Sequence, residues 1–253
     1  MTGDDVATAA GFSQAKVSRI EGGVNVPSTK DVITLAGIYH APPEVRDRLT
    51  QLAEDMKAGA RRVVLNRGGV EFQRRCARIE HASEHVRSFT ATVVPGLLQT
   101  EDYARSLYRT GDLSGDQVEN AVSERMERQV LLGTSDHRFT LLTTEGALYW
   151  CAGSPAVMAA QADRLASPQP ANVRLGVIPR SRPVNCFPMH NWDMYDQRGV
   201  TIGLVSSTAL LTNPVDVKMY DEWFTKLEEL AVFGDDARAI FRRIADEYRR
   251  MES

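Results

Sequence analysis

The residues whose types and spacing suggest a chemical role lie in one short segment, from Ser13 to Glu21. Val17 and Ile20 are three residues apart, so a helix here would turn both toward a core. The opposite face would carry five side chains suited to the DNA major groove: Gln14, Ala15, Lys16, Ser18 and Arg19. Glutamine offers adenine a paired donor and acceptor, arginine forks onto guanine, and alanine or a lysine stem meets the thymine methyl. The segment therefore predicts a DNA recognition helix, with Gln14 and Ala15 making most base contacts because they are nearest its N-terminus.

The flanking segments predict the other helices of a helix-turn-helix unit. One helix is expected over residues 3–10, ending at Gly11, and another over residues 29–39. Residues 10–12 then form the turn between the first two helices, where glycine tolerates a positive φ. Hydroxyl and amide side chains near helix N-termini often contact phosphates. Four residues are therefore candidate DNA backbone contacts: Thr2, Ser13, Asn25 and Ser28.

Residues 57–62 mark a change in pattern and form the predicted linker between two domains. A further helix, starting at Glu44, precedes them. The predicted domains are 1–58, which is all-α, and 59–253. Residues 61–87 hold seven Arg and three Glu, and a solvated helix face is favoured there over contact with the DNA backbone.

The second domain is expected to be α+β, with helices at both ends of a small mixed or antiparallel sheet. Strands are predicted at residues 89–94, 138–144 and 173–178, and in a hairpin formed by 185–195 and 199–206. Helices are predicted at residues 100–108, 115–132, 155–166, 214–233 and 235–251. Within the hairpin, Trp192, Met194 and Tyr195 are a candidate exposed contact for a partner.

The composition is that of an ordinary globular protein. Hydrophobic residues make up 43% and charged residues 25% of the 253 residues, which is enough for a core in each domain. The net charge of −3 shows no overall basic excess, so DNA binding would need a local patch. Three separated cysteines fit a reducing cytoplasm, and no segment has the pattern of a signal peptide or a membrane span.

Two further patterns have both a chemical and a structural interpretation. His81, Glu84 and His85 match H-x-x-E-H, in which two histidines on a helix hold zinc beside a glutamate base. No third ligand is placed, so a polar helix face is favoured, and no metal, cofactor or enzymatic activity is expected. Residues 94–100 either line a ligand or partner site or form a turn closed by Thr100 as a helix cap, and the turn is favoured. Cys151 and Cys186 are expected to be buried.

The run GFSQAKVSRIEGG at residues 11–23, followed by VPS at 26–28, resembles the lambda-repressor/Cro-like regulators, the XRE family. The resemblance covers residues 2–60 and implies a homodimer that binds paired half-sites on double-stranded DNA. It also implies a helix ahead of Thr2, which would pair with Glu21 and cover four residues: Val6, Ala9, Val17 and Ile20. Here Met1 stands directly before Thr2, so the first helix of that family is expected to be missing from this sequence. We hypothesise that a misassigned start codon or a truncated gene explains its absence.

The run VVPGLLQTEDYARSL at residues 93–107, followed by ERMERQVLL at 124–132, resembles a second family. It is similar to the DUF5753 C-terminal domain of actinobacterial WhiJ-like regulators, described as Scr1-type and antitoxin-like. The similarity spans residues 65–250. It implies a role in development or in a toxin–antitoxin-like pair, with a small DUF397-type protein as a candidate partner.

These patterns together predict a cytoplasmic, sequence-specific DNA-binding transcriptional regulator. Its second domain would dimerise and would sense a ligand or a partner protein. The alternative is a protein-binding antitoxin-like module with impaired DNA binding. A metal-dependent hydrolase is the least favoured of the three.

Overall fold

The computed structural model describes residues 2–22, 27–58, 62–66, 69–111, 113–134, 136–204 and 207–252. The chain forms two compact units, Met1–Val63 and Val64–Ser253. This division lies a few residues beyond the predicted boundary at residue 58. Among the described residues, no helix combines the length and the apolar character that crossing a lipid bilayer requires.

Four helices lie in the described part of the first unit, and local sequence signals set their ends. Thr2, Ser13 and Ser28 each precede a helix, and each hydroxyl accepts a hydrogen bond from the backbone N–H three residues further on. Gly11 ends the first helix with a φ of 66°, the left-handed conformation that glycine adopts without strain. The helices are α1 (Gly3–Ala10), α2 (Gln14–Glu21), α3 (Thr29–Ile38) and α4 (Pro43–Ala58).

The core of the first unit is a small apolar cluster between α1, α2 and α3. Val6, Ala7, Val17 and Leu35 are buried in it, and four half-buried residues pack around them: Ala10, Phe12, Ile20 and Ile38. Val6 is 2% exposed and Val17 is 1% exposed. The expectation of lost cover is therefore wrong for Val6 and Val17, because the side chains of α3 and Phe12 pack in the same cluster. Of the other two residues in that expectation, Ile20 is half-buried and Ala9 is exposed.

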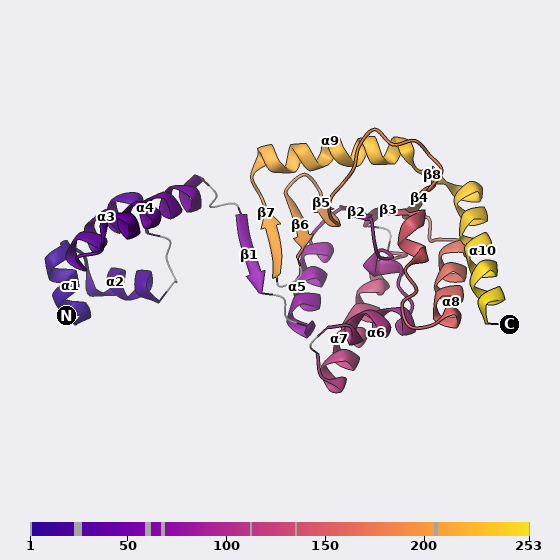
Figure 1. The fold of residues 1–253 in the computed structure, drawn as a ribbon, viewed down its shortest axis with the longest axis horizontal. Coiled ribbons are helices and arrows are strands. Elements are labelled where there is room, and N and C mark those ends of the chain that lie inside the picture. The colour runs from indigo at the N-terminus through magenta and orange to yellow at the C-terminus, as the bar shows by residue number, and fades with distance from the viewer. Residues whose placement is uncertain are drawn as a thin grey trace. The chain divides into compact units, whose positions relative to one another are not determined.

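An eight-stranded mixed sheet organises the second unit, which confirms the predicted α+β class. Its strand order is β1-β7-β6-β5-β2-β3-β4-β8 (Figure 1). Strands β2, β3 and β4 are parallel, whereas β5, β6, β7 and β8 each run antiparallel to a neighbour. The strands are β1 (Arg62–Asn66), β2 (His85–Thr90), β3 (Arg138–Thr144), β4 (Val173–Ile178), β5 (Trp192–Tyr195), β6 (Gly199–Gly203), β7 (Ser207–Leu211) and β8 (Val232–Phe233).

Helices cover both faces of this sheet, so adjacent strand residues enter different cores. Leu141 packs in a cluster with residues of α8 and α10, whereas Leu142 packs in a cluster with residues of α9. Figure 1 shows α9 extended along the sheet and α8 beside α10. The helices of this unit are α5 (Gly69–His81), α6 (Glu101–Arg109), α7 (Gly115–Arg128), α8 (Pro155–Ala166), α9 (Pro214–Leu230) and α10 (Gly234–Met251). Three short 3-10 turns accompany them: η1 (Gly96–Leu98), η2 (Gln129–Leu131) and η3 (Glu145–Tyr149).

Several predicted elements have different bounds in the structure. In the hairpin predicted at 185–195 and 199–206, the first strand is β5, which starts only at Trp192, and the second is β6, which ends at Gly203. The strand predicted at 89–94 is β2, which starts at His85 because its register pairs that residue with Arg138 of β3. The helix predicted at 115–132 ends at Arg128 and continues as η2. The last residues predicted for the helix at 214–233 form β8 instead, since Val232 and Phe233 pair with β4.

Candidate functional site

The exposed face of α2 is the candidate nucleic-acid interface. Val17 is buried and Ile20 is half-buried, and both pack inward in the α1–α3 cluster. The side chains of the other face are exposed, apart from half-buried Lys16: Gln14, Ala15, Ser18 and Arg19. The structure thus brings the predicted base-contacting residues together on one helical surface.

Two basic residues of α2 are engaged within the first unit. Arg19 folds back along its own helix, and its Nε donates to the carbonyl oxygen of Ala15 at 3.1 Å. Lys16 Nζ lies 2.7 Å from Asp31 Oδ1 of α3 and 3.9 Å from the centre of the Phe12 ring. This hydrogen bond from Lys16 is the main reason that the pKa of Asp31 is lowered. Lys16 therefore ties α2 to α3, a positioning role that the sequence pattern did not predict.

The predicted phosphate contacts are helix caps in the structure. The hydroxyls of Thr2, Ser13 and Ser28 accept hydrogen bonds from the N–H groups of residues 5, 16 and 31, at 3.2 to 3.3 Å. Each hydroxyl proton is still able to donate to a phosphate oxygen, because capping uses only an oxygen lone pair. Asn25, the fourth predicted contact, lies outside the described residues.

The residues that hold the recognition helix in place were not predicted from the sequence. Tyr39, beyond the end of α3, donates its hydroxyl to the Glu21 carboxylate at the end of α2, and this bond raises the pKa of Tyr39. Asp31 both completes a capping box with Ser28 and receives Lys16. The S-x-x-D spacing of Ser28 and Asp31 was the available signal, since it resembles a capping box. Only the packing of α2 against α3 shows that the same carboxylate reaches Lys16.

The segment before α6 in the second unit is a closed turn. Thr100 caps α6, because its hydroxyl accepts from the Tyr103 N–H at 3.4 Å. Gln99 Nε2 donates to the Val94 carbonyl oxygen at 2.7 Å, and the Val94 N–H donates to the Tyr103 hydroxyl at 3.1 Å. Gln161 of α8 binds the Thr100 N–H and the Leu98 carbonyl. Residues 94–100 thus form the turn that the sequence favours, with Thr100 as the cap of α6.

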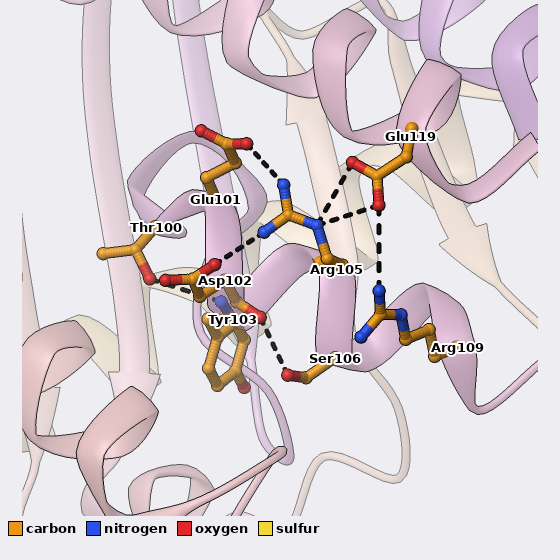
Figure 2. A network of polar contacts seen from close by, with 8 residues as sticks. All are labelled: Thr100, Glu101, Asp102, Tyr103, Arg105, Ser106, Arg109 and Glu119. Atoms are coloured by element: carbon orange, nitrogen blue, oxygen red, sulfur yellow. Dashed lines mark hydrogen bonds and ion pairs between the residues drawn. The ribbon is translucent and has the colours of Figure 1, made fainter. Parts of the chain in front are cut away.

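A surface network of ion pairs links α6 to α7 (Figure 2). Arg105 lies between Asp102, at 2.6 Å, and Glu119, at 2.9 Å, and it also contacts Glu101. Arg109 approaches the same Glu119 at 3.9 Å. Because these carboxylates are more than half exposed, solvent screens the pairs and their contribution to stability is small. The network orients α6 on α7.

Three other interpretations of the sequence change once the tertiary structure is considered. The helical H-x-x-E-H site is wrong, because α5 ends at His81 and His85 already belongs to β2. Within the described residues, no group of three or more potential ligands is arranged to hold a metal ion. Cys151 is exposed rather than buried, whereas Cys186 is buried. The candidate exposed contact at Trp192, Met194 and Tyr195 is also wrong: all three are at most 3% exposed, since β5 lies inside the sheet.

Comparison with protein families matches both units. Residues 73–243, more than half of the chain, match the model of a domain of unknown function, DUF5753. The chain belongs to the DUF5753 family. Residues 1–49 match a helix-turn-helix domain, so this DUF5753 protein carries a DNA-binding type of domain at its N-terminus. None of the curated proteins compared with the chain matches it.

Solved structures give only distant likenesses to this DUF5753 protein. TrmBL2, an archaeal chromatin protein, is 13% identical with a TM-score of 0.33, and the match covers 79% of this chain and 66% of that protein. The phospholipase D family member Nuc from Salmonella typhimurium is 10% identical with a TM-score of 0.39, over 68% of this chain and 97% of Nuc. NucT from Helicobacter pylori is 14% identical with a TM-score of 0.34, over the same shares. These scores carry no inference about function.

Proposed function

We propose that this DUF5753 protein is a sequence-specific DNA-binding transcriptional regulator of the XRE type. The observation that carries the proposal is the exposed face of α2, where Gln14, Ala15, Ser18 and Arg19 lie together above a buried Val17. These side chains have the donor and acceptor groups that read base edges in the major groove. The preceding turn at Gly11 and the capped start of α2 supply the matching helix-turn-helix geometry.

The second unit is proposed to regulate this DNA binding rather than to catalyse a reaction. It would provide dimerisation and would respond to a ligand or to a small DUF397-type partner. The full assignment is a cytoplasmic, antitoxin-like homodimer of the actinobacterial WhiJ-like and Scr1-type class. The sequence similarity of residues 93–107 and 124–132 supports it. The Arg105 network gives no support to an enzymatic role, because its ion pairs are accounted for by the packing of α6 on α7.

Fluorescence anisotropy with the DNA upstream of the gene, over a salt series, tests the proposal. We expect Gln14→Ala and Arg19→Ala each to weaken specific binding by about 1–3 kcal/mol, because each removes a base contact. Arg46→Ala is the matched control, since it removes one exposed positive charge from α4 without touching α2. Equal losses in Arg19→Ala and Arg46→Ala would show that α2 does not read sequence.

The charge of the first domain favours one alternative function. Residues 1–58 carry six Lys or Arg and eight Asp or Glu, so nonspecific attraction to phosphate is weak. The alternative is a protein-binding antitoxin-like module whose DNA binding is impaired. Absence of DNA binding by the parent chain at low salt, with capture of a purified DUF397-type protein, would favour this alternative.

A further inference from the structure

A cavity of about 160 Å³ with a mixed polar and apolar lining lies in the second unit, inside the region matched to DUF5753. The turn before α6, helices α5 and α7, and strands β2, β3, β5, β6 and β7 contribute to its wall. The turn supplies Val94, Gly96, Leu97 and Gln99, which belong to the same motif that closes on α6. Since one water needs roughly 10–15 Å³ of such space, the cavity has room for a small organic molecule.

One of the two arginines in the wall already has a counterion. Arg128 is 9% exposed, and its Nε donates to Glu80 Oε2 at 2.8 Å while a second nitrogen contacts the other Glu80 oxygen. Its remaining nitrogen contacts Gln73. Arg128 and Glu80 therefore neutralise each other, and every nitrogen of this guanidinium is hydrogen-bonded within the protein.

The second arginine, Arg125, has no such partner among the described residues. Its Nη1 donates to the neutral amide oxygen of Gln99, and its guanidinium carbon lies 4.9 Å from the centre of the Tyr108 ring. Its Nε is buried without a hydrogen-bond partner. Burial lowers the pKa of Arg125, yet a guanidinium remains protonated in proteins. Among the described residues, no carboxylate forms an ion pair with Arg125, although its side chain lines the cavity.

Asp193, the other carboxyl group of the wall, is hydrogen-bonded to a serine and not to Arg125. Asp193 accepts a hydrogen bond from Ser88 at 2.6 Å, and burial raises the pKa of its carboxyl, which favours the neutral form. Burial raises the pKa of the Cys76 thiol to about 12, so this group stays neutral.

We propose that this cavity binds a small monocarboxylate whose carboxylate pairs with Arg125 and whose apolar body rests against Val94, Leu97 and Leu141. A carboxylate presents two oxygens in one plane, which fits the guanidinium fork and offers an acceptor to the unpaired Nε of Arg125. Gly96 lies next to the Arg125 guanidinium and places no side chain over it. A Cβ at this position would be in van der Waals contact with the guanidinium, at 3.7 Å.

The binding of the carboxylate is independent of DNA, and only its role as an effector rests on the proposed function. Thermal unfolding of the full chain, followed by tryptophan fluorescence, reports the second unit because Trp150, Trp192 and Trp223 all lie there. The probes are acetate, butyrate, benzoate and phenylacetate, each beside its neutral amide at the same ionic strength. Inorganic phosphate is the additional anion.

We expect at least one carboxylate with an apolar body to raise the Tm by roughly 2–5 °C at ten times its Kd, and its amide to have no effect. Arg125→Gln should weaken binding at least about 10-fold, as expected for a charge-assisted hydrogen bond. Arg109→Gln is the matched control, because Arg109 is an exposed arginine outside the cavity wall. It should leave the ligand-induced shift unchanged.

A second variant covers the possibility that Arg125→Gln does not fold. Gln99→Glu keeps Arg125 and places a carboxylate beside it within the chain itself, so it should abolish the carboxylate effect. Equal Tm shifts with amides and carboxylates would overturn the proposal, and so would a Tm shift with phosphate alone. The absence of a Tm shift with every probe would also overturn it, because the cavity would then bind only water. Anisotropy with and without the bound carboxylate then tests regulation separately, since loss of DNA binding leaves the Tm result unaffected.

Discussion

The two units place their polar residues in opposite ways. The first unit buries only a small apolar cluster around Val17 and keeps Gln14, Ser18 and Arg19 on its surface. The second unit has apolar cores on both faces of a sheet and also buries charged groups, including Glu80 and Arg128. A surface that reads DNA needs exposed side chains on a short helix. Buried charged groups need a core large enough to offset their desolvation.

The largest effect that distinguishes the units should come from breaking the buried ion pair. Glu80→Ala leaves Arg128 buried with an unbalanced charge, so the second unit should lose about 3–5 kcal/mol of unfolding free energy. Urea unfolding followed by tryptophan fluorescence measures this loss. Glu124→Ala is the control, because it removes the 2.7 Å pair with Arg74, which is 60% exposed, and should change stability by less than about 1 kcal/mol. Similar losses in both variants would contradict the difference between a buried and an exposed pair.

The next effect should be confined to the first unit. Val17→Ala removes two methyl groups from its small core and should lower the stability of that unit by about 2 kcal/mol. Amide hydrogen exchange of α2 should accelerate, while the tryptophan-detected transition stays where it is in the parent. A shift of that transition would mean that the two units unfold together.

A helix cap should contribute less than a core residue. Ser28→Ala removes the hydroxyl that caps α3 and should reduce the stability of the first unit by about 1 kcal/mol. Thr8→Ala is the matched control, since the Thr8 hydroxyl only donates to the Asp4 carbonyl within α1. Hydrogen exchange of α3 amides compares the two variants, and equal protection would refute a stabilising cap.

The smallest difference between the two units should appear in how their stability changes as the pH is lowered. Burial lowers the pKa values of His85 and His190 below the ordinary 6.5, so the unfolded state binds more protons as the pH falls through this range. The second unit should therefore lose stability below pH 6.5, by less than about 1 kcal/mol for each histidine. In the first unit, the lowered pKa of Asp31 gives a contribution that is lost only as the pH falls below 3.8. Urea midpoints between pH 7.5 and 5.5 check this, and His85→Gln should show a weaker dependence than the parent.

Local patterns predicted much of the fold because the relevant interactions are close in sequence. The caps at Thr2, Ser13 and Ser28, the turn at Gly11 and the exposed face of α2 all follow from spacing within a few residues. The α+β class and most helices of the second unit were predicted for the same reason. The predicted contact at Trp192, Met194 and Tyr195 failed, because nothing in a short apolar strand shows whether it lies inside or at the edge of a sheet.

The sequence by itself determined the helices of the first unit, the residues that α2 exposes and the membership of the second unit in its class. The tertiary structure alone decided which charged residues meet in the cavity. Glu80 and Arg128 are 48 residues apart, and Arg125 reaches Gln99 across 26 residues. Such pairs depend on how α5 and α7 pack beside the central strands, and helix periodicity carries no information about that packing. The physical reason is that local hydrogen bonding sets each element, whereas burial and charge compensation act only after distant elements have come together.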